Sequence, residues 1–356
     1  MALMLDEEMD ENVTTIKVIG VGGGGGNAVN RMVSDGLQGV EFIAMNTDQQ
    51  ALAKNHAATK VQLGSKLTKG RGAGADPEIG QRAAEESKDE IANALKGSQM
   101  VFITAGMGGG TGTGAAPVVA EVAHDLGILT VGIVTKPFSF EGKRKMGLAE
   151  QGIANLLMHV DSLIVIPNER LKMISQEKIT LMNAFQAADN VLRQGVESIS
   201  ALINVPAFIN LDFADVNTTM KDGGVALMSN GFGEGEGRVR QAVEDALNSP
   251  LLSNNDVKNA KKILFNVYFS EEAELRMEEM NDVHNFMSEF NRDIEVIWGT
   301  AVDNTLGNKV KMTILATGFT MDDIPLIADK RRTEAAQMTE EELRLEEERI
   351  EKERKE

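Results

Sequence analysis

The chain has 356 residues, of which 42% are hydrophobic and 4% aromatic, with a formal net charge of -18 and no cysteine. This length suffices for one large domain or two ordinary ones with a buried core. The absence of cysteine excludes disulfides, thiol nucleophiles and cysteine-ligated zinc or iron–sulfur sites, and the acidic balance disfavours binding to nucleic acid or to an anionic membrane surface.

The chain also lacks the features of a membrane or secreted protein. No stretch approaches the ~18–20 consecutive apolar residues that a membrane span requires. The first twelve residues are acidic and contain no apolar run, which is not the pattern of a signal peptide. We therefore expect a cytoplasmic protein with no nucleic-acid partner and no direct membrane insertion.

The first half of the chain alternates short apolar runs with amphipathic stretches. Runs rich in Val and Ile, uniformly apolar, are typical of strands buried on both faces of a parallel sheet. The pattern predicts a doubly wound, Rossmann-like α/β sheet. The expected strands are 16–21, 40–45, 100–104, 128–134 and 162–166, and the expected helices are 27–34, 77–95, 115–125 and 143–159.

A long helical stretch, 177–203, connects this region to a second one with a different pattern. Gly195 lies within the stretch but costs only ~1 kcal/mol relative to Ala, so the helix is expected to continue through it. The following elements predict a smaller second α/β domain with a mixed sheet. They are strands at 207–211, 225–228, 263–269, 294–300 and 309–317 and helices at 214–220, 238–247 and 274–290.

Glycine is concentrated where two of the predicted strands end. The first strand runs into the sequence GVGGGGG, in which Gly20, Gly22 and Gly25 match the dinucleotide-binding fingerprint. Glycine lets backbone N–H groups approach a phosphate, and the following helix N-terminus adds partial positive charge. By itself this motif is a weak signal, because a tight strand–helix turn without a ligand has the same pattern.

A second glycine run strengthens the interpretation. The strand at 100–104 is followed by GMGGGTGTG, which ends at Gly114 and contributes the hydroxyls of Thr111 and Thr113. Two such loops at neighbouring strand ends would surround one polyphosphate at the switch point of the sheet. The P-loop pattern GxxxxGK[ST] is absent from the sequence, and Gly70–Gly74 supplies a third flexible loop.

These motifs together resemble the tubulin/FtsZ family, and within it the bacterial cell-division GTPases. The resemblance extends from about Val13 to Phe319 and rests on GGGTGTG together with KVIGVGGGGGNAVNRM, FIAMNTD, KGRGAGADPEIG, PFSFEGKRK, FQAADNVLRQG and NLDFADV, in that order. It implies a tubulin/FtsZ-like fold with an acidic disordered N-terminus at 1–12, a GTP-binding domain at 13–176, a central helix at 177–203, a GTPase-activating and assembly domain at 204–319 and a charged tail at 320–356.

The resemblance also implies activity, cofactors and partners. The activity is assembly-dependent hydrolysis of GTP to GDP and phosphate, with Mg²⁺ bound through the nucleotide. The protein is expected to polymerise head to tail with itself into filaments of the division ring. Other cell-division proteins, including membrane tethers, are expected partners, and the expected location is the division site on the inner face of the membrane.

The residues that match the family's nucleotide site are spread over six segments. Phosphate contacts are implied for Gly23, Gly24, Gly25, Gly26 and Asn27, for Asn46 and Asp48, and for Gly108, Gly109, Gly110, Thr111 and Gly112; Glu141 is implied to bind the ribose, and Asn168, Phe185 and Asp189 to bind guanine. A carboxylate can accept both N1–H and the 2-amino group of guanine while an aromatic face stacks on the base. Core packing is the alternative role for Phe185.

One position departs from the family pattern. Where the family usually has Arg, four residues after the ribose-binding Glu, this chain has Lys145, with Arg144 beside it. Lysine provides a point charge rather than the planar fork of arginine. Which of the two side chains reaches the phosphates, or whether both form a solvated basic patch, is left open by the sequence.

The catalytic group is expected on a different part of the chain. Asn210, Asp212 and Asp215 follow the long helix, about 35–40 Å from its start at 1.5 Å rise per residue. A carboxylate that distant cannot act on its own subunit's nucleotide but can act on that of the next subunit in a head-to-tail stack. Helix N-capping is the alternative role for the two aspartates.

Two other classes of function remain as alternatives. A Rossmann-type oxidoreductase would bind a dinucleotide and use an acidic ribose ligand near Asp48. A purely structural filament protein would bind nucleotide without turnover. The histidines, at His56, His124, His159 and His284, lack metal-binding spacing and indicate no further site.

Overall fold

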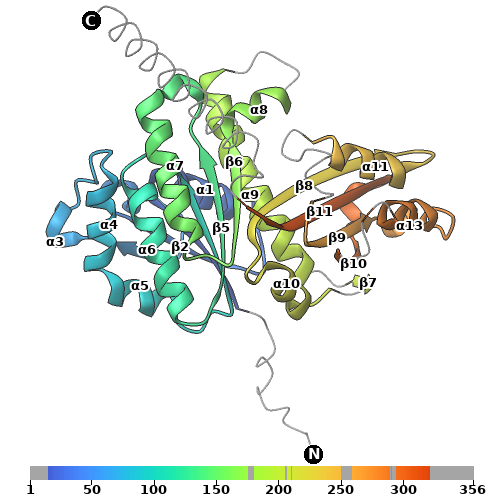
Figure 1. Ribbon diagram of the computed structural model, residues 1–356, viewed down its shortest axis with the longest axis horizontal. Coiled ribbons are helices and arrows are strands. Elements are labelled where there is room, and N and C mark those ends of the chain that lie inside the picture. Colours follow the sequence, from blue (N-terminus) through green and yellow to red (C-terminus); the bar gives the residue numbers. More distant parts are fainter. Residues whose placement is uncertain are drawn as a thin grey trace, which may run out of the picture. The chain divides into compact units, whose positions relative to one another are not determined.

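An eleven-stranded sheet runs through the part of the chain that the computed structural model describes (Figure 1). The described residues are 15–174, 180–204, 207–209, 211–249, 259–288, 290 and 294–320. The strand order is β3-β2-β1-β4-β5-β6-β8-β11-β9-β10-β7. The acidic segment at 1–12 and the tail beyond Thr320 lie outside the described residues, and the division of the chain into domains stays a prediction.

Six parallel strands form the first half of this sheet and confirm the doubly wound prediction. Their order, 3-2-1-4-5-6, is that of a Rossmann-like sheet, in which the connections diverge on either side of β1 and β4. The strands are β1 (Ile16–Val21), β2 (Glu41–Asn46), β3 (Thr59–Gln62), β4 (Met100–Gly106), β5 (Leu129–Lys136) and β6 (Ser162–Pro167). The short strand β3 was not predicted.

The helices around these strands differ from the predictions mainly at their starts. They are α1 (Gly22–Ser34), α2 (Gln49–Ala53), α3 (Ser65–Thr68), α4 (Pro77–Glu86), α5 (Lys88–Leu95), α6 (Thr111–Asp125), η1 (Ser139–Glu141), α7 (Lys143–Leu157) and α8 (Asn168–Ile174). The single helix predicted at 77–95 is wrong, because the chain breaks at Ser87, whose hydroxyl oxygen accepts a hydrogen bond from the backbone N–H of Gly64 at 3.1 Å. Helices α2, α3, η1 and α8 were not predicted.

Helix α1 begins inside the glycine run rather than after it, so the predicted loop before Asn27 is wrong. Glycine is a poor helix former, but close packing requires it here. A Cβ added to Gly25 would lie 2.1 Å from the carbonyl oxygen of Thr104 on β4, and one added to Gly20 would lie 2.4 Å from the carbonyl oxygen of Gly25. The helix therefore starts against the neighbouring strand with no side chain between the two backbones.

The second half of the chain forms a mixed sheet, as predicted. Strands β9 and β10 are parallel, whereas β11 is antiparallel to β9 and β7 is antiparallel to β10. The elements are α9 (Leu181–Asn204), β7 (Ala207–Ile209), α10 (Phe213–Met220), β8 (Gly224–Glu234), α11 (Arg238–Leu247), β9 (Lys262–Phe269), η2 (Glu271–Ala273), α13 (Met280–Ser288), β10 (Glu295–Val302), η3 (Asn304–Leu306) and β11 (Lys309–Phe319). None of the helices in the described part of the chain is long and apolar enough to cross a bilayer.

The helix predicted at 274–290 starts too early. Helix α13 begins only at Met280, and a salt bridge explains why. Arg238 donates to both carboxylate oxygens of Glu279, at 2.8 and 3.1 Å, and the same carboxylate accepts from the backbone N–H of Arg276 at 2.8 Å. These bonds hold the residues before Met280 in turns instead of a helix.

Helix α9 and a short ladder join the two halves of the sheet. Strands β6 and β8 pair through only three residues each, beginning at Ser162 and Gly224. Apolar residues of α9, Val191, Leu192, Val196 and Ile199, share a core with alternate residues of β4 and β5. Gly195 allows this close packing, since a Cβ there would lie 3.2 Å from the side chain of Ile133.

The glycine packing predicts a position-dependent effect of adding one methyl group. Gly25→Ala should lower the free energy of unfolding by about 1–3 kcal/mol, because the new Cβ meets the Thr104 carbonyl. Gly147→Ala on α7 is the matched control, as nothing lies within 4 Å of its Cβ position, and it should raise stability by up to ~1 kcal/mol. Urea unfolding of the two variants measures both, and equal effects would contradict the packing argument.

Candidate functional site

The starts of α1 and α6 touch at the carboxyl ends of β1 and β4. A Cβ on Gly22, which has φ of +71°, would lie 2.7 Å from the backbone nitrogen of Gly112, and one on Gly24 would lie 3.0 Å from that of Gly106. The two glycine runs predicted to surround one ligand are therefore in backbone contact. Only glycine permits this approach.

Both helix starts have the properties of an anion site. The cap residues Val21 and Gly110 provide no side-chain hydrogen bond to the first-turn N–H groups. Those N–H groups and the helix dipoles favour a negative charge at this point. Gly23 and Gly109 have nothing within 4 Å of their Cβ positions, so open space lies beside both backbones.

The hydroxyls of the second glycine run have different partners. The backbone N–H of Gly108, which has φ of +97°, donates to Thr113 Oγ1 at 2.8 Å and fixes the turn. Thr111 is the first residue of α6 and is only partly buried. Its hydroxyl lies 2.6 Å from that of Thr47, which follows β2.

The loop after β2 lies beside these helix starts. Asn46 is buried, and its Oδ1 accepts from the backbone N–H of Asp48 at 3.1 Å. Asp48 Oδ1 caps helix α2 through the N–H groups of Gln50 and Ala51. The third glycine run is tied to the same loop, since Gly72 N–H donates to the Thr47 carbonyl at 3.3 Å.

Glu141 and Lys145 form an ion pair on the other side of the second glycine run. Glu141 Oε1 also accepts from the backbone N–H of Phe138 at 2.9 Å. A Cβ on Gly108 would lie 2.8 Å from Lys145 Cγ, so the Lys145 side chain lies directly against the glycine run. Arg144, the other candidate for the cationic position, is exposed.

The three residues expected to bind a base are two polar residues, Asn168 and Asp189, and one aromatic residue, Phe185. Asn168, which follows β6, is 5% exposed, and its Oδ1 has no hydrogen-bond partner. Burial raises the pKa of Asp189 to about 6, against the opposing effect of Arg31. Phe185 is 41% exposed and lies edge-on to Phe138, with ring centroids 5.4 Å apart. A partly exposed ring, a half-buried carboxylate and a buried amide oxygen without a partner suit a planar ligand with N–H donors better than simple core packing.

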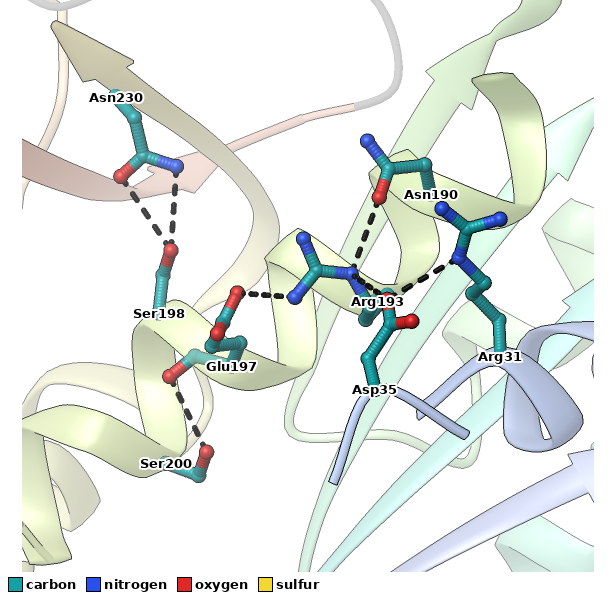
Figure 2. Close-up of polar contacts among 8 residues, drawn as sticks. All are labelled: Arg31, Asp35, Asn190, Arg193, Glu197, Ser198, Ser200 and Asn230. Carbon is teal, nitrogen blue, oxygen red and sulfur yellow. Dashed lines mark hydrogen bonds and ion pairs between the residues drawn. The ribbon is translucent and has the colours of Figure 1, made fainter. Parts of the chain in front are cut away.

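A charged network that we did not predict from the sequence joins α1 to α9 (Figure 2). Asp35, at the end of α1, forms two ion pairs through its Oδ2 atom. They are with Arg31 Nε at 3.1 Å and with Arg193 Nε of α9 at 3.3 Å. Arg193 also binds Glu197 at 2.7 Å and Asn190 at 3.1 Å. The sequence signals that could have indicated this network are the opposite charges four residues apart, Arg31 and Asp35 on α1 and Arg193 and Glu197 on α9. The network holds α9 against α1 one turn beyond Asp189.

The predicted catalytic residues lie away from this site. Asp212 and Asp215 form a capping box at the start of α10, each accepting the other's backbone N–H at 3.0 Å. The capping alternative therefore describes a real role, which uses one oxygen of each carboxylate. Asn210 lies outside the described residues.

Two contacts place the end of α9 and the end of α10 near the amino ends of the parallel strands. The last residue of α9, Asn204, donates to the carbonyl of Gly39, just before β2 begins. Ser162, the first residue of β6, donates to the carbonyl of Met220 at the end of α10. The glycine runs lie at the carboxyl ends of the strands, so α10 and the anion site are separated by about the length of a strand.

Comparisons with known proteins agree with this arrangement. The Tubulin/FtsZ family GTPase domain matches residues 15–176, and the FtsZ family C-terminal domain matches residues 224–320. The chain is 49% identical over 311 residues to the cell division protein FtsZ of Wigglesworthia glossinidia brevipalpis, covering 87% of this chain and 80% of that one. The chain belongs to the FtsZ family.

Other relatives extend the comparison. FtsZ of Buchnera aphidicola is 50% identical over 312 residues, covering 87% of this chain and 81% of that protein. A solved structure described as an empty FtsZ dimer from M. jannaschii is 43% identical with a TM-score of 0.79, covering 86% of this chain and 88% of that one. CetZ2 from Haloferax volcanii has a TM-score of 0.76 at 19% identity, covering 92% of this chain and 100% of that one, and shares the fold.

The family assignment decides between the classes of function considered above. The chain is a tubulin-like GTPase of the cell-division family, and the anion site lies within its GTPase domain. The alternative of a Rossmann-type oxidoreductase is not supported. The fingerprint at Gly20–Gly25 arises because both classes place a phosphate against a glycine-rich strand–helix turn.

The raised pKa of Asp189 predicts how the stability of the nucleotide-free protein depends on pH. Its pKa in the folded state is about 6, above the ordinary value of 3.8. The ionised carboxylate therefore destabilises the fold above pH 6, and this penalty disappears as the pH falls from about 6 towards 4. Urea unfolding at pH 7 and pH 5 should show wild type gaining stability relative to Asp189→Asn at the lower pH. A difference that does not change with pH would contradict the assignment.

Proposed function

We propose that this GTPase binds the phosphates of GTP at the touching starts of α1 and α6. The observation that carries this proposal is the pair of helix N-termini without side-chain caps, with open space beside Gly23 and Gly109. Free first-turn N–H groups of α1 and α6 act as donors to the phosphates, within residues 23–27 and 109–112. The Gly108 N–H instead holds the turn by donating to Thr113. The Thr111 hydroxyl and the Lys145 ammonium complete the cradle, and Asn46 and Asp48 border the γ-phosphate.

Guanine and ribose bind on the side of the site formed by η1, α8 and α9. With a pKa of about 6 the Asp189 carboxyl is ionised at neutral pH, and it accepts the N1–H and 2-amino protons of guanine. Asn168 Oδ1, buried without a partner, gains a donor from the ligand. The exposed ring of Phe185 stacks on the base. Glu141 binds the ribose hydroxyls.

Mg²⁺ is proposed to bind mainly through the nucleotide. The described residues contain no group of three or more His, Cys, Asp or Glu side chains that could hold a metal ion. Magnesium commonly uses substrate phosphates and water together with one or two carboxylates. When bound it would neutralise charge on the phosphates, while the glycine runs and Lys145 hold the nucleotide in place.

Hydrolysis is proposed to require a second subunit. Asp212 and Asp215, with Asn210, would orient the attacking water on the nucleotide of the adjacent molecule. The support is their separation from the anion site, since α9 has 24 residues and spans about 36 Å. Each carboxylate retains one oxygen outside the capping box. Head-to-tail contact of this kind does not close, and it produces an open filament whose assembly completes each active site.

These filaments are proposed to form the division ring on the inner face of the cell membrane. The names of the relatives from Wigglesworthia and Buchnera, both cell division proteins, support this role. Attachment to the membrane then requires other proteins of the division apparatus, including membrane tethers.

The cradle predicts that a methyl group at Gly23 affects binding without affecting folding. Gly23→Ala has free space for its Cβ within the protein and replaces a helical glycine, so stability should be unchanged or slightly higher. The same methyl group would occupy space reserved for the phosphates, and GTP affinity should fall by at least about tenfold. Equilibrium binding of a fluorescent GTP analogue measures this effect. Wild-type affinity in Gly23→Ala would contradict the placement of the phosphates.

The shared active site predicts complementation between two inactive variants. Asp212→Asn keeps the helix cap, since Asn caps as well as Asp, but removes the carboxylate. Asp189→Ala removes the proposed guanine ligand. Each variant alone should hydrolyse GTP at least about 100-fold more slowly than wild type. Mixing them should restore activity, because the intact Asp212 of one then faces the nucleotide bound by the other.

The protein concentration and a surface variant provide controls for this experiment. Phosphate release by wild type should rise more steeply than linearly with protein concentration until filaments form. Asp245→Asn, at an exposed position of α11, serves as the surface control in the same mixtures. Failure of the mixture to exceed the sum of the separate rates would reject a site completed by a neighbour.

A further inference from the structure

The hydroxyl pair formed by Thr47 and Thr111 has an arrangement that determines the direction of its hydrogen bond. Thr47 follows β2 and is fully buried, with 0% exposure. Thr111 is the first residue of α6 and is only partly buried. The two Oγ1 atoms are 2.6 Å apart, so one of them donates to the other.

Burial decides which of the two is the donor. Within the described part of the chain, Thr111 Oγ1 is the only hydrogen-bond partner of Thr47 Oγ1. If Thr111 donated, the proton of Thr47 would be left in the interior without an acceptor, which is unfavourable. If Thr47 donates, its proton is satisfied, and the proton of Thr111 is free to point out of the protein at the mouth of the site.

Thr47 is also held rigidly by its backbone. Its carbonyl oxygen accepts from the Gly72 N–H at 3.3 Å. It also lies 3.3 Å from the Thr68 hydroxyl, whose single proton is shared with the nearer Gly64 carbonyl at 3.0 Å. These bonds attach it to the third glycine run and to α3. The Thr47 backbone is therefore held before any ligand binds, and burial of the side chain beside Thr111 limits where its hydroxyl can lie. Both lower the cost of orienting the Thr111 hydroxyl.

We propose that Thr47 is a positioning residue for the phosphate site: it donates its hydroxyl proton to Thr111 Oγ1 and thereby directs the Thr111 hydroxyl proton towards a phosphate oxygen of the nucleotide. This inference rests on the proposed binding of GTP phosphates at the start of α6. Thr47 does not itself touch the ligand. Its whole effect on binding passes through Thr111, and that dependence can be measured.

A double-mutant cycle tests the dependence. The variants are Thr47→Val, Thr111→Val and the pair together, and the readout is the Kd of a fluorescent GTP analogue at protein concentrations too low for assembly. Thr47→Val should weaken binding about 5–10-fold, because the Thr111 hydroxyl loses its fixed direction. In the Thr111→Val background the same change should have less than about a twofold effect.

Two further variants separate positioning from simple loss of structure. Thr47→Ser keeps the hydroxyl and should bind within about twofold of wild type. Thr130→Val is the matched control, since Thr130 is equally buried and its hydroxyl donates to the Ile128 carbonyl at the opposite edge of the sheet. It should resemble Thr47→Val in Tm while leaving GTP affinity unchanged. If Thr47→Val does not fold, Thr47→Ala takes its place in the cycle.

Three results would overturn the inference. Equal losses from Thr47→Val with and without Thr111 would show a structural role independent of Thr111. Wild-type affinity in Thr47→Val, or a loss in Thr47→Ser as large as that in Thr47→Val, would show that the hydroxyl does not matter. Absence of GTP binding by wild type itself would instead reject the proposed function, and the cycle distinguishes that failure from the others.

Discussion

The backbone contact between the starts of α1 and α6 is the constraint on which the rest of the site depends. Gly22 and Gly112 approach so closely that no Cβ fits between them. The contact brings two sets of free helix N–H groups to one point, where their dipoles add. Binding of a polyanion by a protein of net charge -18 is therefore a local property, since fixed backbone dipoles act at short range and surface charges are screened.

Helix α9 connects this point to the rest of the molecule. Its first turns carry Phe185 and Asp189, and its middle is bound to α1 through Arg193 and Asp35. Its end lies near the amino ends of the strands and leads to Asp212. One rigid element thus separates the proposed nucleotide ligands from the proposed catalytic carboxylates by more than side chains can span. In the proposed mechanism, that separation couples hydrolysis to assembly.

Several features could be predicted because they depend on local pattern. The parallel strands were found from uniformly apolar runs, and α11 (Arg238–Leu247) was predicted with its exact bounds from helical periodicity. The glycine runs were found because no other residue type serves at such turns. Errors occurred where a distant contact overrides the local pattern, as at Ser87, which hydrogen-bonds to Gly64, and at Glu279, which Arg238 holds.

The sequence by itself determined the order of the buried strands other than β3, the two glycine-rich turns, the family and the residue types available for a guanine nucleotide. Only the tertiary structure decided that α1 starts at Gly22 and that Asp35 and Arg193 link two helices. It also decided that Lys145 rather than Arg144 lies against the glycine run, and that a buried Thr47 contacts Thr111. The physical reason is range. Periodicity and turn chemistry act between residues close in sequence, whereas the cradle is made by segments that meet only when the sheet has formed.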